Sequence, residues 1–169
     1  MITNRLLQLS TRTAIRKNNT LRASIPYKQA RSIGVLFSVE DKQKHDAIKA
    51  FIKQLEADGK TVKVLEYLPV AKENYEFLFD FFTIKDLSFW GSLKSSDAEK
   101  FINMPFDYLY CVDRVHNPLI LHLLARSKAL CRVGRFGEND YAYFELMIEQ
   151  DGPIQSLIES MYKYTRQLK

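Results

Sequence analysis

A chain of 169 residues, of which 46% are hydrophobic and 12% aromatic, has enough apolar side chains to bury the core of one globular domain, which excludes an intrinsically disordered protein. Its apolar runs fall well short of the ~20 residues that a membrane-spanning helix needs. The net charge of +5 is unevenly distributed, because residues 1–32 carry seven basic side chains and no acid, whereas residues 33–169 carry 18 basic and 20 acidic ones.

The basic segment 1–32 is interpreted as a leader that precedes an α/β domain at 33–169. Apolar residues interspersed with arginines predict a helix over residues 3–17, which the pair Asn18-Asn19 brings to an end. An arginine-rich, acid-free start is typical of a basic helix that lies on its own domain, and also of a mitochondrial transit peptide. The candidate polyanion-binding side chains are Arg5, Arg12, Arg16, Lys17, Arg22, Lys28 and Arg31.

From residue 32 the pattern alternates between strands and helices. Short apolar runs rich in β-branched and aromatic residues predict strands, and apolar residues at helical spacing beside capping signals predict helices. The predicted strands are 32–39, 61–68, 76–84, 106–113, 129–134 and 141–148, and the predicted helices are 41–58, 96–103, 117–128 and 151–168.

Strands separated by helices pair in parallel through right-handed crossovers. The order of elements therefore predicts an α/β fold, a single-domain three-layer sandwich of Rossmann-like or flavodoxin-like type with a mostly parallel sheet. The links after residues 68 and 134 are too short for crossover helices, which predicts antiparallel or edge pairing at those two places.

In open sheets of this kind, ligands bind beyond the carboxyl ends of the strands. Two stretches there make a candidate anion- or ligand-binding rim, which consists of Asp113, Arg114, His116, Asn117, Gly134, Arg135 and Gly137. A helix N-terminus and two arginines favour an anion, and a carboxylate near an imidazole could serve acid–base chemistry. The alternative is structural: Asn117 caps a helix, Asp113 and Arg114 form a solvated loop pair, and the glycines serve a turn.

The turn after the first predicted strand argues against a nucleotide enzyme. Dinucleotide sites need glycines there so that backbone amides can approach the pyrophosphate. This turn reads FSVEDKQKHD, with no glycine and with two adjacent acids, Glu40 and Asp41. Walker, nucleophile-elbow, HExxH and EF-hand patterns are also missing from the sequence. We therefore assign no catalytic residue, no cofactor and no metal site.

The only tryptophan, Trp90, lies next to Phe89 and Gly91 in a segment between predicted elements. We expect this segment to fold the indole ring back onto the core. The alternative is an exposed aromatic corner, which is a common partner-binding feature.

Cys111 and Cys131 each lie within an apolar run, which predicts reduced thiols in the core and an intracellular compartment. The predicted location is the cytoplasm, or the mitochondrial matrix if residues 1–32 are a transit peptide.

The phrases SIGVLF, GKTVKVLEYL, IKDLSFWG, FDYLYCVD, LLARSKALCRVG and YFELMI, in this order, resemble a bacterial family of unknown function, domain of unknown function 6913, over essentially the whole chain. The resemblance implies a cytoplasmic protein and supplies no activity. Residues 106–113 and 125–134 are also similar in order to the amino-terminal half of heptosyltransferase-type glycosyltransferases. Those enzymes bind their nucleotide sugar mainly through a second domain, so this likeness implies only a lone Rossmann-like module.

Two functions remain open from the sequence. The favoured one is a non-catalytic binding or adaptor protein whose basic leader contacts an anionic partner, namely RNA, a ribosome or an acidic protein. The alternative is a small ligand-binding domain or enzyme that uses the rim for a phosphate-containing metabolite or sugar phosphate. The leader could also be an intramolecular clasp that neutralises the acid-rich remainder of the chain.

Overall fold

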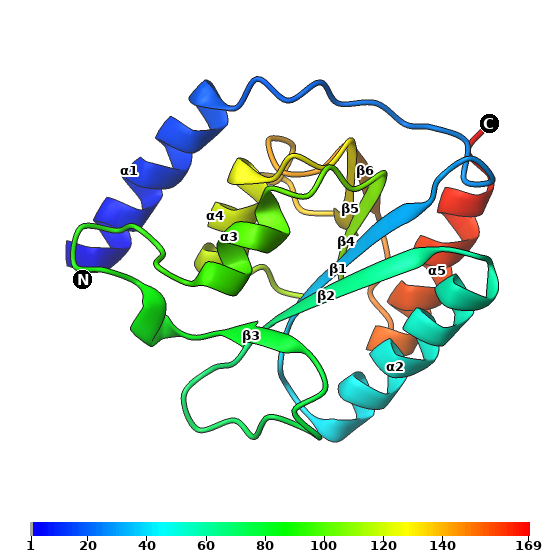
Figure 1. Ribbon diagram of the computed structural model, residues 1–169, viewed down its shortest axis with the longest axis horizontal. Coiled ribbons are helices and arrows are strands. Elements are labelled where there is room, and N and C mark those ends of the chain that lie inside the picture. The colour runs from blue at the N-terminus through cyan, green and yellow to red at the C-terminus, as the bar shows by residue number, and fades with distance from the viewer. Residues whose placement is uncertain (1) are drawn as a thin grey trace.

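The computed structural model describes the backbone of residues 2–169 and the side chains of residues 4–169, and it shows one sheet between two layers of helices (Figure 1). The strands are β1 (Ser32–Ser38), β2 (Thr61–Tyr67), β3 (Asp80–Phe82), β4 (Tyr108–Cys111), β5 (Cys131–Arg135) and β6 (Leu146–Ile148). The helices are α1 (Ile2–Lys17), α2 (Lys42–Ala57), α3 (Ser96–Ile102), α4 (Pro118–Arg126) and α5 (Ile154–Arg166), with a short 3-10 turn at Ile84–Asp86.

The six strands are all parallel and lie in the order β3-β2-β1-β4-β5-β6. This is the strand order of the Rossmann fold and differs from the flavodoxin order. Strands β1 and β4 are central and almost completely buried, because their apolar residues follow one another without polar interruption. The predicted three-layer α/β sandwich of Rossmann-like type is thus confirmed.

Of the two alternatives predicted after residues 68 and 134, antiparallel pairing is wrong and edge pairing is confirmed, since β3 and β6 lie at the two edges of the sheet. Both pair in parallel through connections without an α-helix, at 68–79 and 136–145. A helix is not needed because β3 and β6 are short and pair only with the carboxyl-terminal ends of their neighbours. Each connection therefore has to return only about 10 Å along the sheet.

The predicted strand 76–84 is shorter than expected because its first half has a left-handed backbone. Glu76 and Phe77 have φ angles of 62° and 46°, which no β-strand accommodates. The chain becomes extended only at Asp80, where pairing with Leu65 of β2 begins.

Helices α2 and α5 cover one face of the sheet, and α1, α3 and α4 cover the other (Figure 1). Each face has its own apolar core, because alternate residues of β1 point to opposite sides: Val35 and Phe37 to one core, Leu36 to the other. Cys111 and Cys131 are buried free thiols, as predicted. Within residues 2–169, no helix combines the length and the apolar character that crossing a membrane requires.

The predicted helix at 3–17 is confirmed as α1, which packs along α4. After α1 the chain crosses the top of the molecule in Figure 1 and enters β1 on the other side. Leu7, Tyr27 and Ala30 from this segment are buried in the two cores. Residues 2–32 are therefore packed into the same folded unit as the remainder of the described chain.

Candidate functional site

A doubly wound sheet binds its ligand where the strand order reverses, which here is between the carboxyl ends of β1 and β4. An ion pair occupies this position. Asp113, just after β4, is fully buried, and its carboxylate accepts hydrogen bonds from Lys44 Nζ (2.7 Å) and from Ser38 N and Oγ (2.8 Å each). The same ammonium of Lys44 donates to Glu40 at 2.7 Å. Asp113 thus joins β4 to β1 and α2 and has no surface to offer a ligand.

The first turn of α2 is closed to an anion. The Asp41 carboxylate accepts a hydrogen bond from Lys44 N at 2.8 Å and caps the helix. Glu40 and Asp41 are both exposed beside these amides. A phosphate approaching the amides would meet two carboxylates, so this turn repels the group that a dinucleotide site attracts.

His116 is oriented by Asp140 and not by Asp113. Its Nδ1 lies 2.6 Å from Asp140 Oδ2, and its ring centroid is 5.0 Å from that of Phe144. A carboxylate-oriented imidazole is the arrangement that acid–base catalysis uses. However, the His116 side chain is only 6% exposed, and its Nε2 makes no hydrogen bond within the described part of the chain. The dyad is therefore shielded from any substrate in solution.

Arg135 is held by neighbouring loops. Its guanidinium donates to the Gln150 carbonyl (3.0 Å), to Asp151 (2.5 Å) and to the Arg114 carbonyl (3.4 Å). Asn117 caps α4 by accepting a hydrogen bond from Leu119 N at 2.8 Å. Arg114 itself is exposed, and across residues 2–169 its side chain forms no salt bridge.

Gly134 and Gly137 both lie directly against side chains. A methyl group on Gly134 would lie 2.3 Å from the Phe144 ring, and one on Gly137 would lie 2.3 Å from Asp140 Oδ2. Neither glycine has a positive φ. The absence of a side chain at these two positions lets Phe144 and Asp140 pack over β5 and the turn that follows it. This packing accounts for both glycines without a phosphate-binding loop.

The rim residues thus lie along one edge of the sheet, but most of their polar atoms are engaged with each other or with nearby loops. A groove of about 400 Å³ lies elsewhere, beside β2 and between α2 and α3. Within the residues that the structure describes, no three His, Cys, Asp or Glu side chains are grouped to hold a metal ion.

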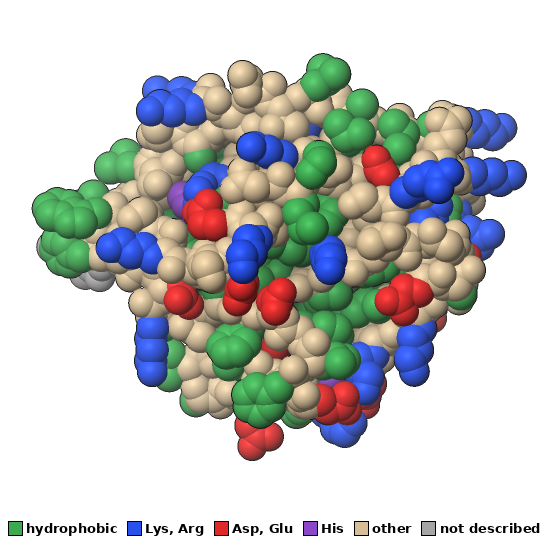
Figure 2. All heavy atoms as spheres, in the orientation of Figure 1, with side chains coloured by type: hydrophobic (Ala, Val, Ile, Leu, Met, Phe, Trp, Pro, Cys, Tyr) green, Lys and Arg blue, Asp and Glu red, His purple; other side chains and the backbone are tan. Residues whose placement is uncertain are grey.

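The seven basic residues of the leader do not form one patch. Arg22 is partly buried, donates to the Ala129 carbonyl and faces Glu145 at 3.9 Å. Burial lowers the pKa of Arg22 to about 10. The other six are exposed and form no salt bridge within residues 2–169. Four of them lie on α1 and two just before β1, on the other side of the molecule (Figure 1): Arg5, Arg12, Arg16 and Lys17, then Lys28 and Arg31. Figure 2 shows basic side chains on both of these sides.

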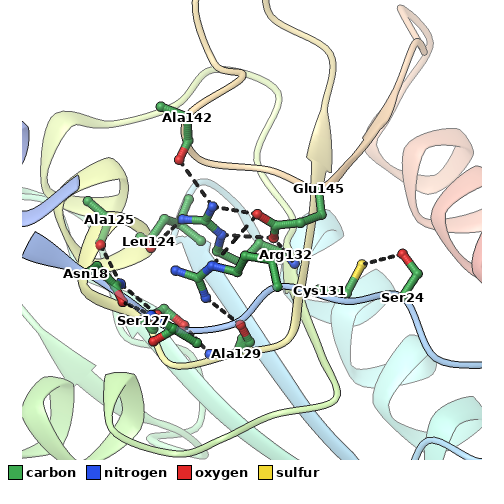
Figure 3. A network of polar contacts seen from close by, with 12 residues as sticks. Asn18, Ser24, Leu124, Ala125, Ser127, Ala129, Cys131, Arg132, Ala142 and Glu145 are labelled. Carbon is green, nitrogen blue, oxygen red and sulfur yellow. Dashed lines mark hydrogen bonds and ion pairs between the residues drawn. The ribbon is translucent and has the colours of Figure 1, made fainter. Parts of the chain in front are cut away.

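The leader is fastened to α4 by polar contacts as well as by Leu7. Asn18 Nδ2 donates to the carbonyls of Ala125 (2.8 Å) and Ser127 (3.0 Å), at the end of α4 (Figure 3). Thr11 Oγ1 lies 2.9 Å from His122 Nδ1. Burial lowers the pKa of His122 to about 4, so the imidazole of this contact is neutral at pH 7.

Arg132, from the segment CRVGRFG, is a buried structural residue (Figure 3). It binds Glu145 in a bidentate manner, with Nη2 to Oε1 at 2.6 Å and Nε to Oε2 at 3.0 Å. It also donates to the carbonyls of Leu124 (2.9 Å) and Ala142 (3.1 Å). This arginine therefore ties β5 to α4 and to the turn before β6, and is not available to bind an anion.

Glu66 on β2 is buried without a partner. It is 1% exposed, it is paired in register with Phe37, and neither carboxylate oxygen accepts a hydrogen bond within residues 2–169. Burial raises the pKa of Glu66 from an ordinary 4.5 to about 7. Because the pKa is higher in the folded state, the unfolded chain releases this proton at a lower pH than the folded protein does. The free energy of unfolding is therefore highest below pH 4.5 and falls as the pH rises from about 4.5 to about 7.

Replacing Glu66 by glutamine is expected to remove that pH dependence. Relative to the unchanged protein, the Glu66→Gln variant should gain about 3 kcal/mol in free energy of unfolding between pH 4.5 and pH 8. Urea unfolding at both pH values measures the difference. Glu56→Gln, at an exposed position of α2, is the matched control and should show no such gain. A Glu66→Gln protein whose stability follows the unchanged protein at both pH values would contradict the assignment.

The strand order defines a doubly wound α/β protein of Rossmann type. The Lys44–Asp113 ion pair occupies the place where the strand order reverses, and the turn after β1 lacks a phosphate-binding glycine loop. The chain matches the model of a family of unknown function (DUF6913) over residues 4–168, and it belongs to that family. No curated protein matches the chain. The likeness to heptosyltransferase-type glycosyltransferases has no counterpart in these comparisons.

Sequence reasoning missed the partners Lys44, Asp140 and Glu145. Lys44 could have been found, because it precedes the buried Ile48 and Phe51 at helical spacing and therefore lies on the inner face of α2. A lysine on a buried helix stripe requires buried hydrogen-bond acceptors, among which a carboxylate also compensates the charge. Asp140 and Glu145 carry no such signal, since both lie in the irregular connection 136–145, where no helical or strand spacing marks a buried face.

Proposed function

We propose that the protein is a non-catalytic binding module that contacts a polyanion through the exposed side of α1. One observation carries this proposal: Arg5, Arg12 and Arg16 are all exposed and have no acidic partner within residues 2–169. At 3.6 residues per turn, their spacing of seven and four residues keeps the three side chains within an arc of about 40° around the helix axis. Together they form a row about 16 Å long.

The row lies on the side of α1 that points away from the protein. Leu7, Thr11 and Asn18 face α4 and fix the helix by packing and hydrogen bonds. The helix thus aligns the three arginines, while their guanidinium groups form no salt bridge within residues 2–169. The clasp alternative would need acidic partners for them, but the described leader makes only one such contact, between Arg22 and Glu145.

A function at the carboxyl edge of the sheet is less well supported. There, Asp113, His116 and Arg135 already have partners inside the protein. The exposed row on α1 is the larger uncompensated feature. Coulomb attraction and counterion release act on such a row without reading a sequence, so we expect weak, sequence-independent binding.

The proposal is tested by the salt dependence of binding to a short single-stranded RNA. If three or four side chains neutralise phosphates, log K should fall with log salt with a slope of about −2 to −3, at about 0.7 per phosphate. The Arg5→Gln/Arg12→Gln/Arg16→Gln variant should flatten the slope by about 2 while the fold stays intact. Fluorescence anisotropy of labelled RNA, over a salt series, gives both slopes.

The matched control replaces three exposed lysines elsewhere by glutamine, at Lys53, Lys63 and Lys163, and so removes the same net charge. This control should keep most of the slope. Equal loss in both triple variants would show that net charge alone matters and would contradict a site on α1. No binding by the unchanged protein at low salt would overturn the proposal as a whole.

A further inference from the structure

A rigid hairpin turn projects beside the start of α1. Ser88 and Ser92 close it through main-chain (2.8 Å) and hydroxyl (2.7 Å) contacts, and Leu87 and Leu93 form an antiparallel bridge at its base. The Gly91 amide donates to the Ser88 carbonyl at 3.0 Å. The two residues at the tip of this turn are therefore held in fixed positions by the backbone.

Phe89 and Trp90 occupy the tip and point into solvent. Their exposed fractions are 64% and 78%, and their rings lie edge to face with centroids 5.5 Å apart. The expectation that the indole folds back onto the core is wrong, and the exposed aromatic corner is what the structure shows. The hydrogen bonds between Ser88 and Ser92 keep the turn closed, so its tip residues cannot reach back to the core.

The hairpin rests directly on α1. A methyl group at Gly91 would lie 2.8 Å from the backbone of Leu6 and Leu7, so only glycine permits this contact, and its φ of 78° also requires glycine. The aromatic tip therefore lies at the end of α1 where the arginine row begins with Arg5. Lys85 and Lys94 on either side of the hairpin are exposed, whereas Asp86 is occupied by the Thr83 amide at 2.7 Å.

We propose that Phe89 and Trp90 form a stacking platform for the bases of a single-stranded nucleic acid whose phosphates follow the arginine row of α1. This inference rests on the function proposed above and names its partner. Exposed aromatic rings bind bases of any sequence by stacking, and basic side chains along a line track the backbone. A duplex keeps its bases stacked inside, so it would offer these rings no faces.

The shape of the charged surface favours a nucleic acid over a membrane. Three arginines in one row about 16 Å long fit a chain-like polyanion. A lipid surface needs charges and apolar groups spread over one plane. Membrane insertion of the same tip is nevertheless an outcome that the experiment below can detect.

Trp90 is the only tryptophan of the chain, so intrinsic fluorescence reports on this site alone. Single-stranded RNA should quench that fluorescence, and inorganic polyphosphate of similar charge should bind more weakly and leave it unchanged. Measured with labelled RNA, Trp90→Leu and Phe89→Leu should each weaken binding roughly 5- to 150-fold without changing the salt slope. Tyr141→Leu, which removes another exposed ring, is the control and should bind like the unchanged protein.

Each other outcome decides against the inference in its own way. If polyphosphate binds as well as RNA and both tip variants bind normally, the stacking platform is overturned while polyanion binding by α1 stands. If neither polyanion binds, the proposed function falls with it. If vesicles of phosphatidylserine and phosphatidylcholine shift the fluorescence to the blue and RNA has no effect, the tip is a membrane contact and the inference is overturned.

Discussion

Replacing Lys44 by methionine is expected to lower the free energy of unfolding by about 3–5 kcal/mol, a large part of the 5–15 kcal/mol that such a domain possesses. The Lys44 ammonium is buried and lies 2.7 Å from the fully buried Asp113. Methionine keeps much of the side-chain volume but leaves the carboxylate with only its two hydrogen bonds from Ser38. Urea unfolding of both proteins measures the loss.

The two members of this pair should not be equivalent. Asp113→Asn should cost less than Lys44→Met, because the ammonium then keeps Glu40 as a partner, with a side chain that is 46% exposed. The Lys44→Met/Asp113→Asn double variant should recover part of the stability lost in Lys44→Met, since neither position then carries a buried charge. Lys42→Met is the control: its pair with Asp46 is exposed, and its loss should stay below about 1 kcal/mol. Similar losses at positions 42 and 44 would refute the role of the buried pair.

Removing the leader is expected to prevent cooperative folding. A chain that begins at Arg31 loses Leu7, Tyr27 and Ala30 from the two cores, together with the Asn18 contacts that close the end of α4. The sequence interpretation treated residues 1–32 as an arm beside a separate domain, and the contacts of the described leader lead us to the opposite expectation. Circular dichroism during thermal unfolding should show no cooperative transition in the truncated chain.

A matched pair of point variants separates packing from the mere presence of α1. Leu7 is 2% exposed against α4, and Leu9, on the same helix, is 57% exposed. Leu7→Ala should cost about 2–5 kcal/mol, and Leu9→Ala should stay within about 0.5 kcal/mol. Equal effects would mean that α1 does not pack as described, and a stable truncated domain would restore the idea of a separable arm.

Much of the fold was predictable because it depends on local patterns. The runs at 32–39 and 106–113 predicted the strands that the structure shows as β1 and β4, and Asn117 followed by Pro118 predicted the start of α4, since capping and periodicity act over a few residues. The two edge strands were harder, because their pairing depends on where β2 and β5 end in space and not on their own sequences. The left-handed backbone at Glu76 and Phe77 could not be predicted, because neither position is a glycine or an asparagine.

The candidate site was less predictable than the fold. Sequence identified the carboxyl edge of the sheet, but the availability of its side chains depends on partners from distant segments, such as Lys44 for Asp113 and Asp140 for His116. The direction of Trp90 was predicted wrongly, because it depends on the close approach of Gly91 to α1. Charge was the exception: the basic character of the leader is a property of composition and needs no partner.

The contact between α1 and α4 also determines when the arginine row can exist. Thr11 and His122, which meet in this contact, are 111 residues apart in the chain. At about 5–20 residues per second, a ribosome needs roughly 5–20 s to synthesise the intervening segment. A helix of 16 residues is marginal in water on its own, so α1 is incompletely formed during that interval. A nascent chain thus displays its arginines before they are aligned, and the aligned row appears only once α4 has folded.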